Sequence, residues 1–319
     1  MRAAVIGVGT AGSIHTTVLR EQNRLCAVCD IDENKLSKYA GIPTYTDYKK
    51  MIAEQKPDAV HICTPHYLHA EMIIYALSLG INVLSEKPLC ISYEQIDAVL
   101  EAEKSSSAAL GVCFQNRYNK ENVFVKEYLK DKKVVSAVAE VAWHRTKEYY
   151  ASGEWRGKYA TEGGGVLINQ ALHTLDLLQY FAGCPAEIVS NVCNLTLSDA
   201  VEVEDTAVIQ GVCGAGITLF ATNGAASDMP VTVTIRTEDE LIYVIPDHVY
   251  INGAEQNLAE TYAKKLGKDC YGSGHALLIT DFYKHLENKE KFKIDGAEAS
   301  KAVRLVLAAY RSGGKAVLV

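Results

Sequence analysis

The stretch Ala3-Ala4-Val5-Ile6-Gly7-Val8-Gly9-Thr10-Ala11-Gly12 runs from a short apolar segment into a glycine-rich turn. The apolar residues predict a buried parallel strand, and residues 10–19 predict the helix that follows it. Gly7 permits the tight turn, Gly9 lets a pyrophosphate approach the backbone, and Gly12 lets the helix pack closely on the strand. N–H groups at the start of this helix attract phosphate. The stretch therefore predicts a dinucleotide-binding α/β fold.

An acidic residue stands where such a fold needs one. Residues 24–29 form a second apolar run, and Asp30 follows at its end. A carboxylate at this strand tip can accept hydrogen bonds from both ribose hydroxyls of NAD and would repel the 2′-phosphate of NADP. Asp30 therefore favours NAD over NADP as the cofactor.

The size and composition of the chain suit a two-domain globular protein. It has 319 residues, of which 48% are hydrophobic and 22% charged, with a net charge of −7. The lysines and arginines form no basic stripe, which argues against nucleic-acid binding. No apolar run approaches the ~18 residues that span a bilayer, which argues against a membrane partner. Because Met1-Arg2 leads straight into the first strand, we expect no signal peptide and a cytoplasmic location.

The cysteines predict no chemistry of their own. Most of the nine lie in apolar runs, where we expect reduced core residues. Cys26 and Cys29 have the C-x-x-C spacing that is typical of metal and redox sites. They lie in a predicted strand, where residues three apart point to opposite faces, and no second pair follows. We therefore expect no metal or redox site at this pair.

Short apolar strands alternate with helical patterns in the first third of the chain. This alternation predicts a doubly wound parallel sheet, which we assign to an N-terminal domain of residues 1–118. Ligands bind such sheets outside the carboxyl ends of the strands, and Thr64-Pro65-His66 and Glu86-Lys87 directly follow predicted strands. The predicted strands are 3–6, 24–29, 59–62, 82–85 and 110–112, and the predicted helices are 10–19, 33–40, 48–54, 69–79 and 93–105.

Longer alternating segments follow, and they predict antiparallel strands with one buried face. The fold class is therefore α/β plus α+β: a Rossmann domain, then a large, mostly antiparallel open sheet with flanking helices. We assign residues 119–319 to this second domain and expect the active site in a cleft between the two. The predicted strands are 134–144, 187–197, 207–211, 216–222, 231–236 and 241–245, and the predicted helices are 119–129, 166–181 and 297–311.

Several motifs of the two domains form a recognisable set. A Glu-Lys-Pro segment follows a strand at 86–88, and three glycines in 162–176 precede a helix that carries a histidine. Together with the glycine turn and the segments 63–69 and 116–119, they make the chain resemble the Gfo/Idh/MocA family of sugar and polyol oxidoreductases. The resemblance covers nearly the whole chain. It implies an NAD(P)-dependent dehydrogenase that interconverts a secondary alcohol and a ketone on a sugar, sugar derivative or cyclic polyol.

The resemblance implies catalytic roles for Lys87 and His173. An ammonium group would stabilise negative charge on the reacting oxygen as hydride leaves, and imidazole, with an ordinary pKa of ~6.5, suits a general acid/base. The resemblance also implies a cis peptide between Lys87 and Pro88. The structural alternatives are a surface lysine and a buried helix histidine bonded to Asp176.

Asn169 is the third catalytic candidate and departs from a common family pattern. Many relatives carry aspartate at this position, and asparagine can neither accept a proton nor carry charge. It can still orient a substrate hydroxyl or His173. In the predicted helix, Asn169, His173 and Asp176 share one face. The change weakens a two-residue proton relay and points to a different sugar subclass, such as acidic or N-acetylated sugars.

The resemblance places further residues near the ligands. Arg117, Trp155 and Arg156 are candidates for substrate binding, beside Lys87, Asn169 and His173. An arginine–aromatic cluster suits a sugar or an anionic group on it, and the alternative is a loop that packs on its own domain. Three tyrosines (Tyr149, Tyr150 and Tyr159) lie in the same loop, and His275 begins a helix. The predicted cofactor-binding residues are Gly7, Gly9, Thr10, Ala11, Gly12, Asp30, Thr64, Pro65, His66, Glu86, Lys87 and Asn116.

No metal site is predicted, because His66 and His69 flank a turn with no carboxylate or cysteine to complete a ligand set. No G-x-S-x-G elbow of a hydrolase occurs. Two other functions stay open: an enzyme whose tightly bound NAD assists epimerisation, elimination or bond cleavage, and a non-catalytic NAD- or sugar-binding sensor. The resemblance implies a homodimer or homotetramer formed through the C-terminal sheet.

Overall fold

The computed structural model describes residues 1–212, 214–259, 266 and 272–319. Its contacts divide the chain into two compact units. Unit 1 comprises Met1–Gln115 and Ala263–Ala299, and unit 2 comprises Asn116–Tyr262 and Ser300–Val319. The sequence predicted a single boundary at 118/119. The return of the chain to unit 1 over Ala263–Ala299 was not predicted.

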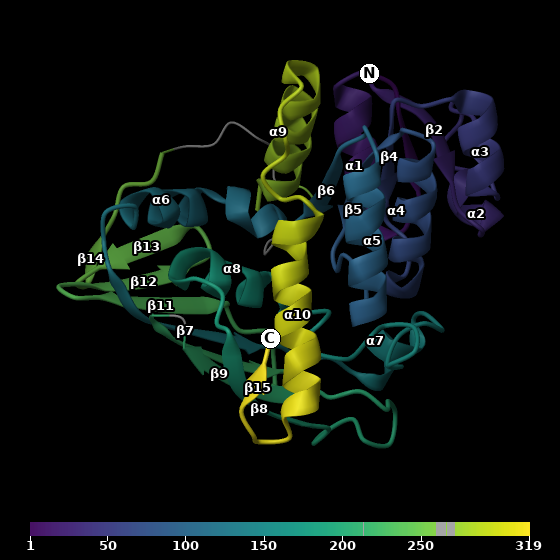
Figure 1. Ribbon diagram of the computed structural model, residues 1–319. Helices are drawn as coiled ribbons and strands as arrows, with labels where there is room; N and C mark the ends of the chain where they lie inside the picture. The colour runs from purple at the N-terminus through teal and green to yellow at the C-terminus, as the bar shows by residue number, and fades with distance from the viewer. Residues whose placement is uncertain (213, 260–265, 267–271) are drawn as a thin grey trace. The chain divides into compact units, whose positions relative to one another are not determined.

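Unit 1 is built on a six-stranded parallel sheet in the order β3-β2-β1-β4-β5-β6, the doubly wound arrangement that the sequence predicted (Figure 1). β1, β4 and the central residues of β5 are fully buried, as expected for strands covered by helices on both faces. The strands are β1 (Ala3–Ile6), β2 (Leu25–Cys29), β3 (Thr44–Tyr45), β4 (Ala59–Ile62), β5 (Asn82–Glu86) and β6 (Leu110–Cys113).

The helices of unit 1 lie between these strands, and one returns from far along the chain. Gly111 in β6 leaves no room for a side chain, because an added Cβ would lie 2.9 Å from both Phe282 and Phe292. This close approach seats the returning helix α9 (Gly274–Asn288) on the sheet. The other helices are α1 (Thr10–Glu21), α2 (Glu33–Leu36), α3 (Tyr48–Gln55), η1 (His66–Leu68), α4 (His69–Ser78) and α5 (Tyr93–Ser105).

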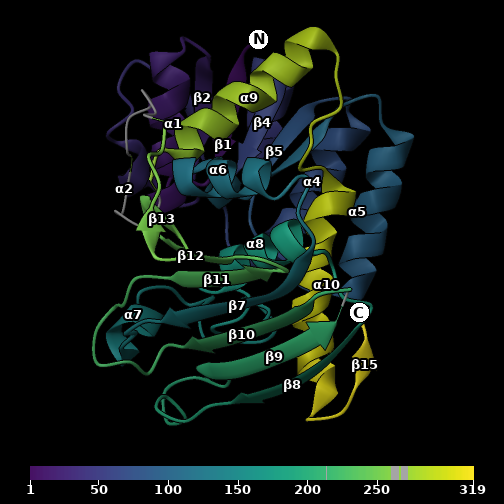
Figure 2. The same cartoon turned by 90° about the vertical axis from the view of Figure 1, so that its left-hand side faces the viewer.

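Unit 2 is built on a nine-stranded sheet in the order β14-β13-β12-β11-β7-β10-β9-β8-β15 (Figure 2). Among the described strands of this sheet, only β7 and β10 pair in parallel and the other neighbours are antiparallel, which confirms a mostly antiparallel open sheet. The strands are β7 (Val134–Ala142), β8 (Glu187–Cys193), β9 (Thr206–Val212), β10 (Gly216–Thr222), β11 (Thr232–Thr237), β12 (Leu241–Ile245), β13 (His248–Ile251), β14 (Ala254–Glu255) and β15 (Val317–Leu318).

Within the part of the chain that the structure describes, helix packing covers one face of this sheet and leaves exposed side chains on the other. Residues of β7 alternate between exposed and buried, and α8 (Leu172–Ala182) packs against β7. The remaining helical elements of this part are η2 (Gln115–Tyr118), α6 (Lys120–Tyr128), α7 (Lys147–Ala151) and α10 (Gly296–Ser312), the last of which begins in unit 1 and continues in unit 2. Among the described residues, no helix combines the length and the apolar character that crossing a bilayer requires.

Candidate functional site

In the glycine turn of unit 1, two of the three glycines have no room for a side chain and the third has open space beside it. Gly7 has a φ of +85°, and a Cβ there would lie 2.5 Å from the carbonyl oxygen of Cys63. A Cβ at Gly12 would lie 1.9 Å from the carbonyl oxygen of Gly7, so the helix and the strand need both glycines to meet. A Cβ at Gly9 would meet nothing within 4 Å. The open backbone at Gly9, ahead of the first turn of α1 with Thr10 and Ala11, is a cradle that fits a pyrophosphate.

Asp30 lies beside this turn and is largely buried. Its Oδ2 accepts the backbone N–H of Val8 at 2.9 Å, and its Oδ1 accepts that of Asp32 at 3.0 Å. The ammonium group of Lys35 lies 3.6 Å from Oδ1. Each carboxylate oxygen can accept a second hydrogen bond, so the group can still receive the hydroxyls of a ribose. Asp30 thus connects the end of β2 to the glycine turn and fits a dinucleotide there.

The loops after β4 and β5 are connected by a histidine. The ring of His69 is buried; its Nδ1 lies 2.7 Å from the carbonyl oxygen of Pro88 and its Nε2 lies 2.9 Å from that of Thr64. These contacts join the segment with Thr64, Pro65 and His66 to the segment with Lys87. His69 was considered above only as a metal ligand. The H-x-x-H spacing in 66–69 was the available signal for it, but its partners are backbone carbonyls.

Lys87 follows β5, and its peptide bond to Pro88 is cis, as the family resemblance implied. The backbone N–H of Lys87 lies 3.2 Å from the Oε2 of Glu86. The two neighbouring residues differ in burial: Glu86 is buried in unit 1, whereas Lys87 is half-buried just after the end of β5.

Glu86 is the centre of a buried polar network that the sequence did not predict. Its Oε1 lies 3.1 Å from His15 Nε2 and 3.5 Å from His275 Nε2. Burial alone would raise the pKa of Glu86, but the hydrogen bonds from these two histidines outweigh it and hold the pKa well below its usual value. The other ring nitrogen of His15, Nδ1, lies 2.7 Å from the Nδ1 of His61. The Nε2 of His61 lies 2.9 Å from the hydroxyl of Tyr283.

One proton assignment satisfies this whole chain. Burial lowers the pKa of both His15 and His61, so both rings are neutral and each donates one hydrogen bond. The hydroxyl of Tyr283 donates to His61, which donates to His15, and His15 donates to Glu86. Among the described residues, the donor atoms of His15, Glu86, Cys113 and His275 also lie within 4.8 Å of one another, as metal ligands would. We interpret the group as a hydrogen-bonded network, because the carboxylate already accepts protein donors.

In unit 2, the glycine-rich segment does not form the predicted helix from residue 166. The carboxylate of buried Glu204 accepts the N–H groups of Gly165 and Leu167 at 2.9 and 3.0 Å, and the N–H of Ala171 bonds to the carbonyl of Val166, five residues back. The regular helix α8 therefore begins only at Leu172. His173 lies in its first turn, and Asn169 precedes it, so the predicted continuous helix face from Asn169 to Asp176 is wrong.

Asn169 belongs to a polar cluster in the aromatic loop. Its Nδ2 donates to Oε1 of Glu162, and the other carboxylate oxygen of Glu162 accepts the N–H of Gly157 at 2.5 Å. The hydroxyl of Tyr149 accepts from Arg156 Nη1 at 2.7 Å. Gln170 Nε2 approaches the same hydroxyl at 3.1 Å. The sequence contained Glu162 in a motif but gave it no role, and an acidic residue directly before three glycines was the signal for it.

The two arginines predicted to bind substrate have different partners in unit 2. The guanidinium of Arg156 stacks on the rings of Trp155 and Tyr149, 4.5 and 4.6 Å from their centroids. Arg117 is buried and forms a bidentate ion pair with Asp176. The arginine–aromatic arrangement therefore holds for Arg156, while Arg117 lies in a structural ion pair.

Tyr150 of the aromatic loop and the predicted cofactor residue Asn116 each bond to an asparagine. Tyr150 is buried, and its hydroxyl accepts from Asn223 at 2.9 Å. Asn116 lies in η2, and its carbonyl oxygen accepts from Asn122 Nδ2 at 2.8 Å.

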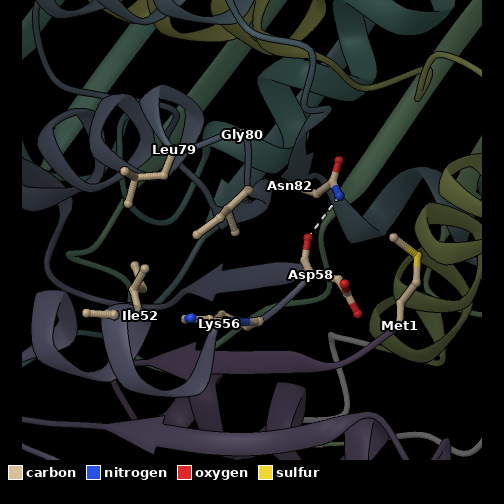
Figure 3. A pocket seen from close by; sticks show the side chains of 10 residues that line it. Met1, Ile52, Lys56, Asp58, Leu79, Gly80 and Asn82 are labelled. Atoms are coloured by element: carbon tan, nitrogen blue, oxygen red, sulfur yellow. Dashed lines mark hydrogen bonds between the residues drawn. The ribbon is translucent and has the colours of Figure 1, made fainter.

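A cavity of about 480 Å³ opens at the opposite edge of the unit 1 sheet (Figure 3). Met1 and Asp58 precede strands there, and Asn82 begins β5, so the cavity lies at the amino ends of the strands. Asn82 Nδ2 donates to the carbonyl of Asp58 at 2.9 Å, the bond drawn in Figure 3. Neither the glycine turn nor Lys87 lines this cavity, so the cavity is not part of the candidate site.

Comparison with known proteins identifies the class of the chain as an NAD-binding oxidoreductase. Residues 1–114 match the family model described as "Oxidoreductase family, NAD-binding Rossmann fold", and residues 132–244 match the GFO/IDH/MocA C-terminal domain. The chain belongs to the GFO/IDH/MocA family, and its N-terminal unit matches the family's NAD-binding Rossmann domain.

Three relatives illustrate the likeness. The WlbA dehydrogenase of Bordetella pertussis, solved with NADH and UDP-GlcNAcA, superposes with a TM-score of 0.85 at 26% identity and covers 100% of this chain and 98% of that chain. The D-glucoside 3-dehydrogenase of Escherichia coli is 28% identical over 58% of this chain and 55% of its own. The inositol 2-dehydrogenase of Rubrobacter xylanophilus is 30% identical over 56% and 51%. The chain thus matches about half the length of these two curated relatives.

Proposed function

We propose that the protein is an NAD-dependent dehydrogenase that interconverts a secondary alcohol and a ketone on a sugar, sugar derivative or cyclic polyol. The observation that carries the proposal is the edge of the parallel sheet, where the open backbone of Gly9, the carboxylate of Asp30 and the strand-end Lys87 occur together. Family membership and the dehydrogenase relatives support it.

Each catalytic candidate has a separate task in the proposed reaction. When bound, NAD would supply the hydride acceptor for the oxidation. The ammonium group of Lys87 stabilises negative charge on the reacting oxygen, and His173 takes the hydroxyl proton on a ring nitrogen during oxidation and returns it during reduction. Asn169, Trp155 and Arg156 bind and orient the substrate.

The substrate panel follows from the relatives. The WlbA structure holds UDP-GlcNAcA, a nucleotide-linked sugar acid, and the other relatives are named for a glucoside and an inositol. The stacked guanidinium of Arg156 suits both a hydroxyl-rich ring and an acidic group. The panel therefore contains free sugars, glucosides, inositols and UDP-linked N-acetyl sugar acids.

The test is the formation of NADH across this panel with the wild type and Lys87→Met. Lys49→Met, at an exposed lysine of the same unit, is the matched control. NADH with one substrate class, lost in Lys87→Met and kept in the control, supports the proposal. Product without net NADH, from protein that retains its nucleotide on dialysis, favours NAD-assisted epimerisation, elimination or bond cleavage. Binding of NAD or sugar without turnover favours a sensor.

We also propose that the uncovered face of the unit 2 sheet forms a homodimer or homotetramer. Tyr243, Val138 and Val189 lie in one cross-strand row and are 38, 47 and 36% exposed, and Phe220 pairs with Val208 on the same face. Exposed apolar side chains in adjacent rows favour association.

The mass in solution tests this face. Phe220→Glu should shift the wild-type oligomer to smaller species. Tyr67→Glu, which alters a residue of similar exposure on unit 1, should not. A monomeric wild type would overturn the proposal. We further propose a cytoplasmic location, with which the free thiols of the described cysteines agree.

A further inference from the structure

The carboxylate of Glu162 is fully buried, and each of its two oxygens accepts a hydrogen bond. One oxygen accepts the backbone N–H of Gly157 at 2.5 Å, and the other accepts the Nδ2 of Asn169. The guanidinium of Arg156 lies 3.9 Å from the oxygen that faces Asn169. A buried carboxylate is stable only with such donors, so these contacts are part of the fold rather than chance neighbours.

The contact with Glu162 fixes which way the amide of Asn169 points. A carboxylate only accepts hydrogen bonds, so the nitrogen of the amide must face Glu162. The hydroxyl of Tyr149, 3.4 Å from the same nitrogen, lies on that side as well. The carbonyl oxygen of Asn169 therefore points away from Glu162 and from Tyr149.

The same contact explains an amide at position 169. An aspartate there would bring a second carboxylate against buried Glu162, and one of the two would have to take up a proton. Glutamate at 162 and asparagine at 169 are thus a complementary pair. The carboxylate of Glu162 carries the charge and accepts from the amide nitrogen of Asn169, and the amide oxygen of Asn169 is a neutral acceptor.

We propose that Glu162 is the positioning residue for Asn169: it holds the amide so that Oδ1 accepts a hydrogen bond from a substrate hydroxyl. The inference rests on the proposed function, which supplies the substrate. Glu162 itself touches neither substrate nor cofactor and acts only through Asn169.

Replacement of Glu162 by glutamine tests the orientation. The N–H of Gly157 cannot turn, so the carbonyl oxygen of the introduced glutamine must accept from it and the new amide nitrogen must face Asn169. Asn169 then flips, and it offers a donor to the substrate in place of an acceptor. We expect Glu162→Gln to lower kcat by about tenfold, the effect of one lost hydrogen bond in the transition state.

The second substitution should rescue the first. In Glu162→Gln/Asn169→Asp the amide and the carboxylate exchange places: the amide at position 162 donates to the carboxylate at position 169, and that carboxylate again presents an acceptor to the substrate. Asn169→Asp alone should lower kcat and add an ionisation to the pH profile, because two carboxylates share one proton. In the double variant that ionisation should disappear and kcat should exceed that of either single variant. Glu154→Gln, at an exposed glutamate of the same loop, is the control and should retain wild-type rates.

Two readouts separate failure of this inference from failure of the proposed function. Rates that fall additively in the double variant, with no extra ionisation in Asn169→Asp, would overturn the positioning role. If the wild type produces no NADH from any substrate, the proposed function fails, and melting of the wild type, the two single variants and the double variant decides the pairing. The pairing predicts that Asn169→Asp melts lower than the wild type, increasingly so as pH rises, and that Glu162→Gln restores it. Additive melting shifts would overturn the pairing.

Discussion

Arg117 donates from Nε and Nη2 to the two carboxylate oxygens of Asp176, at 2.7 and 2.6 Å. Both side chains are buried, and the guanidinium also stacks 4.3 Å from the ring centroid of Tyr180. The pair connects η2 to α8, the helix that carries His173. Asp176, the acid that the sequence offered as a partner for His173, is thus paired with Arg117. The arrangement indicates that Arg117 stabilises unit 2, where the sequence suggested substrate contact.

The first prediction concerns this pair. Removal of one partner leaves the other charge buried and uncompensated, so Arg117→Ala and Asp176→Ala should each lower the free energy of unfolding by about 3–5 kcal/mol. The double variant should lose much less than the sum of the two. Urea unfolding of the four proteins measures the coupling. A raised KM in Arg117→Ala with unchanged stability would restore the substrate role instead.

The second prediction concerns cofactor choice at Asp30. Loss of the carboxylate removes the acceptor for the ribose hydroxyls and the repulsion of a 2′-phosphate, so Asp30→Ala should lower kcat/KM for NAD relative to NADP by about tenfold or more. Glu33→Ala is the control, since Glu33 is an exposed acid three residues along the chain. The ratio of kcat/KM for the two cofactors is the measurement. A wild type that already prefers NADP would contradict the role of Asp30.

The repeating parts of the fold were predictable from local pattern. The residues of β10 and β12 matched the predicted strands end to end, because alternation with one buried face determines the register. The two-residue strands β3, β14 and β15 were not predicted, because such short segments contain no period and form only against a neighbour already in place.

What the sequence could not predict depends on contacts between distant residues. Glu204 delays the start of α8 by binding N–H groups of residues about forty positions earlier, a tertiary effect that overrides helical periodicity. Likewise, His15 and His275 converge on Glu86 from opposite ends of unit 1, and no spacing motif encodes that meeting. The individual site residues were visible in the sequence, whereas their hydrogen-bond partners were not.

The third prediction is that the Glu86 network functions without a metal ion. Since Glu86 accepts from His15 and the backbone of Lys87, dialysis against EDTA should leave the melting temperature and NADH formation unchanged. Cys113→Ser should melt close to the wild type, because a structural thiol is replaced by a hydroxyl of similar size. Elemental analysis of the purified protein completes the test. One zinc ion per chain, removed by EDTA together with a fall in melting temperature, would identify these side chains as metal ligands.

The last prediction concerns pH and Glu121, which lies in the first turn of α6 and is 6% exposed. Burial raises the pKa of Glu121 to about 7, and the nearby carboxylate of Asp247 acts in the same direction. In the unfolded chain the group ionises at its ordinary, lower pKa. Between these two values the folded state binds more protons than the unfolded state, so the free energy of unfolding must fall as pH rises through this window.

Glu121→Gln removes this titration while it keeps the size of the side chain. The variant should match the wild type near pH 5 and exceed it by about 1–3 kcal/mol near pH 8, because only the wild type must then bury a charge or hold a proton. Urea unfolding at both pH values measures the difference, and Glu127→Gln, at an exposed position of the same helix, should show no pH-dependent gain. A constant offset between Glu121→Gln and the wild type across this range would mean that Glu121 has an ordinary pKa and that water reaches it.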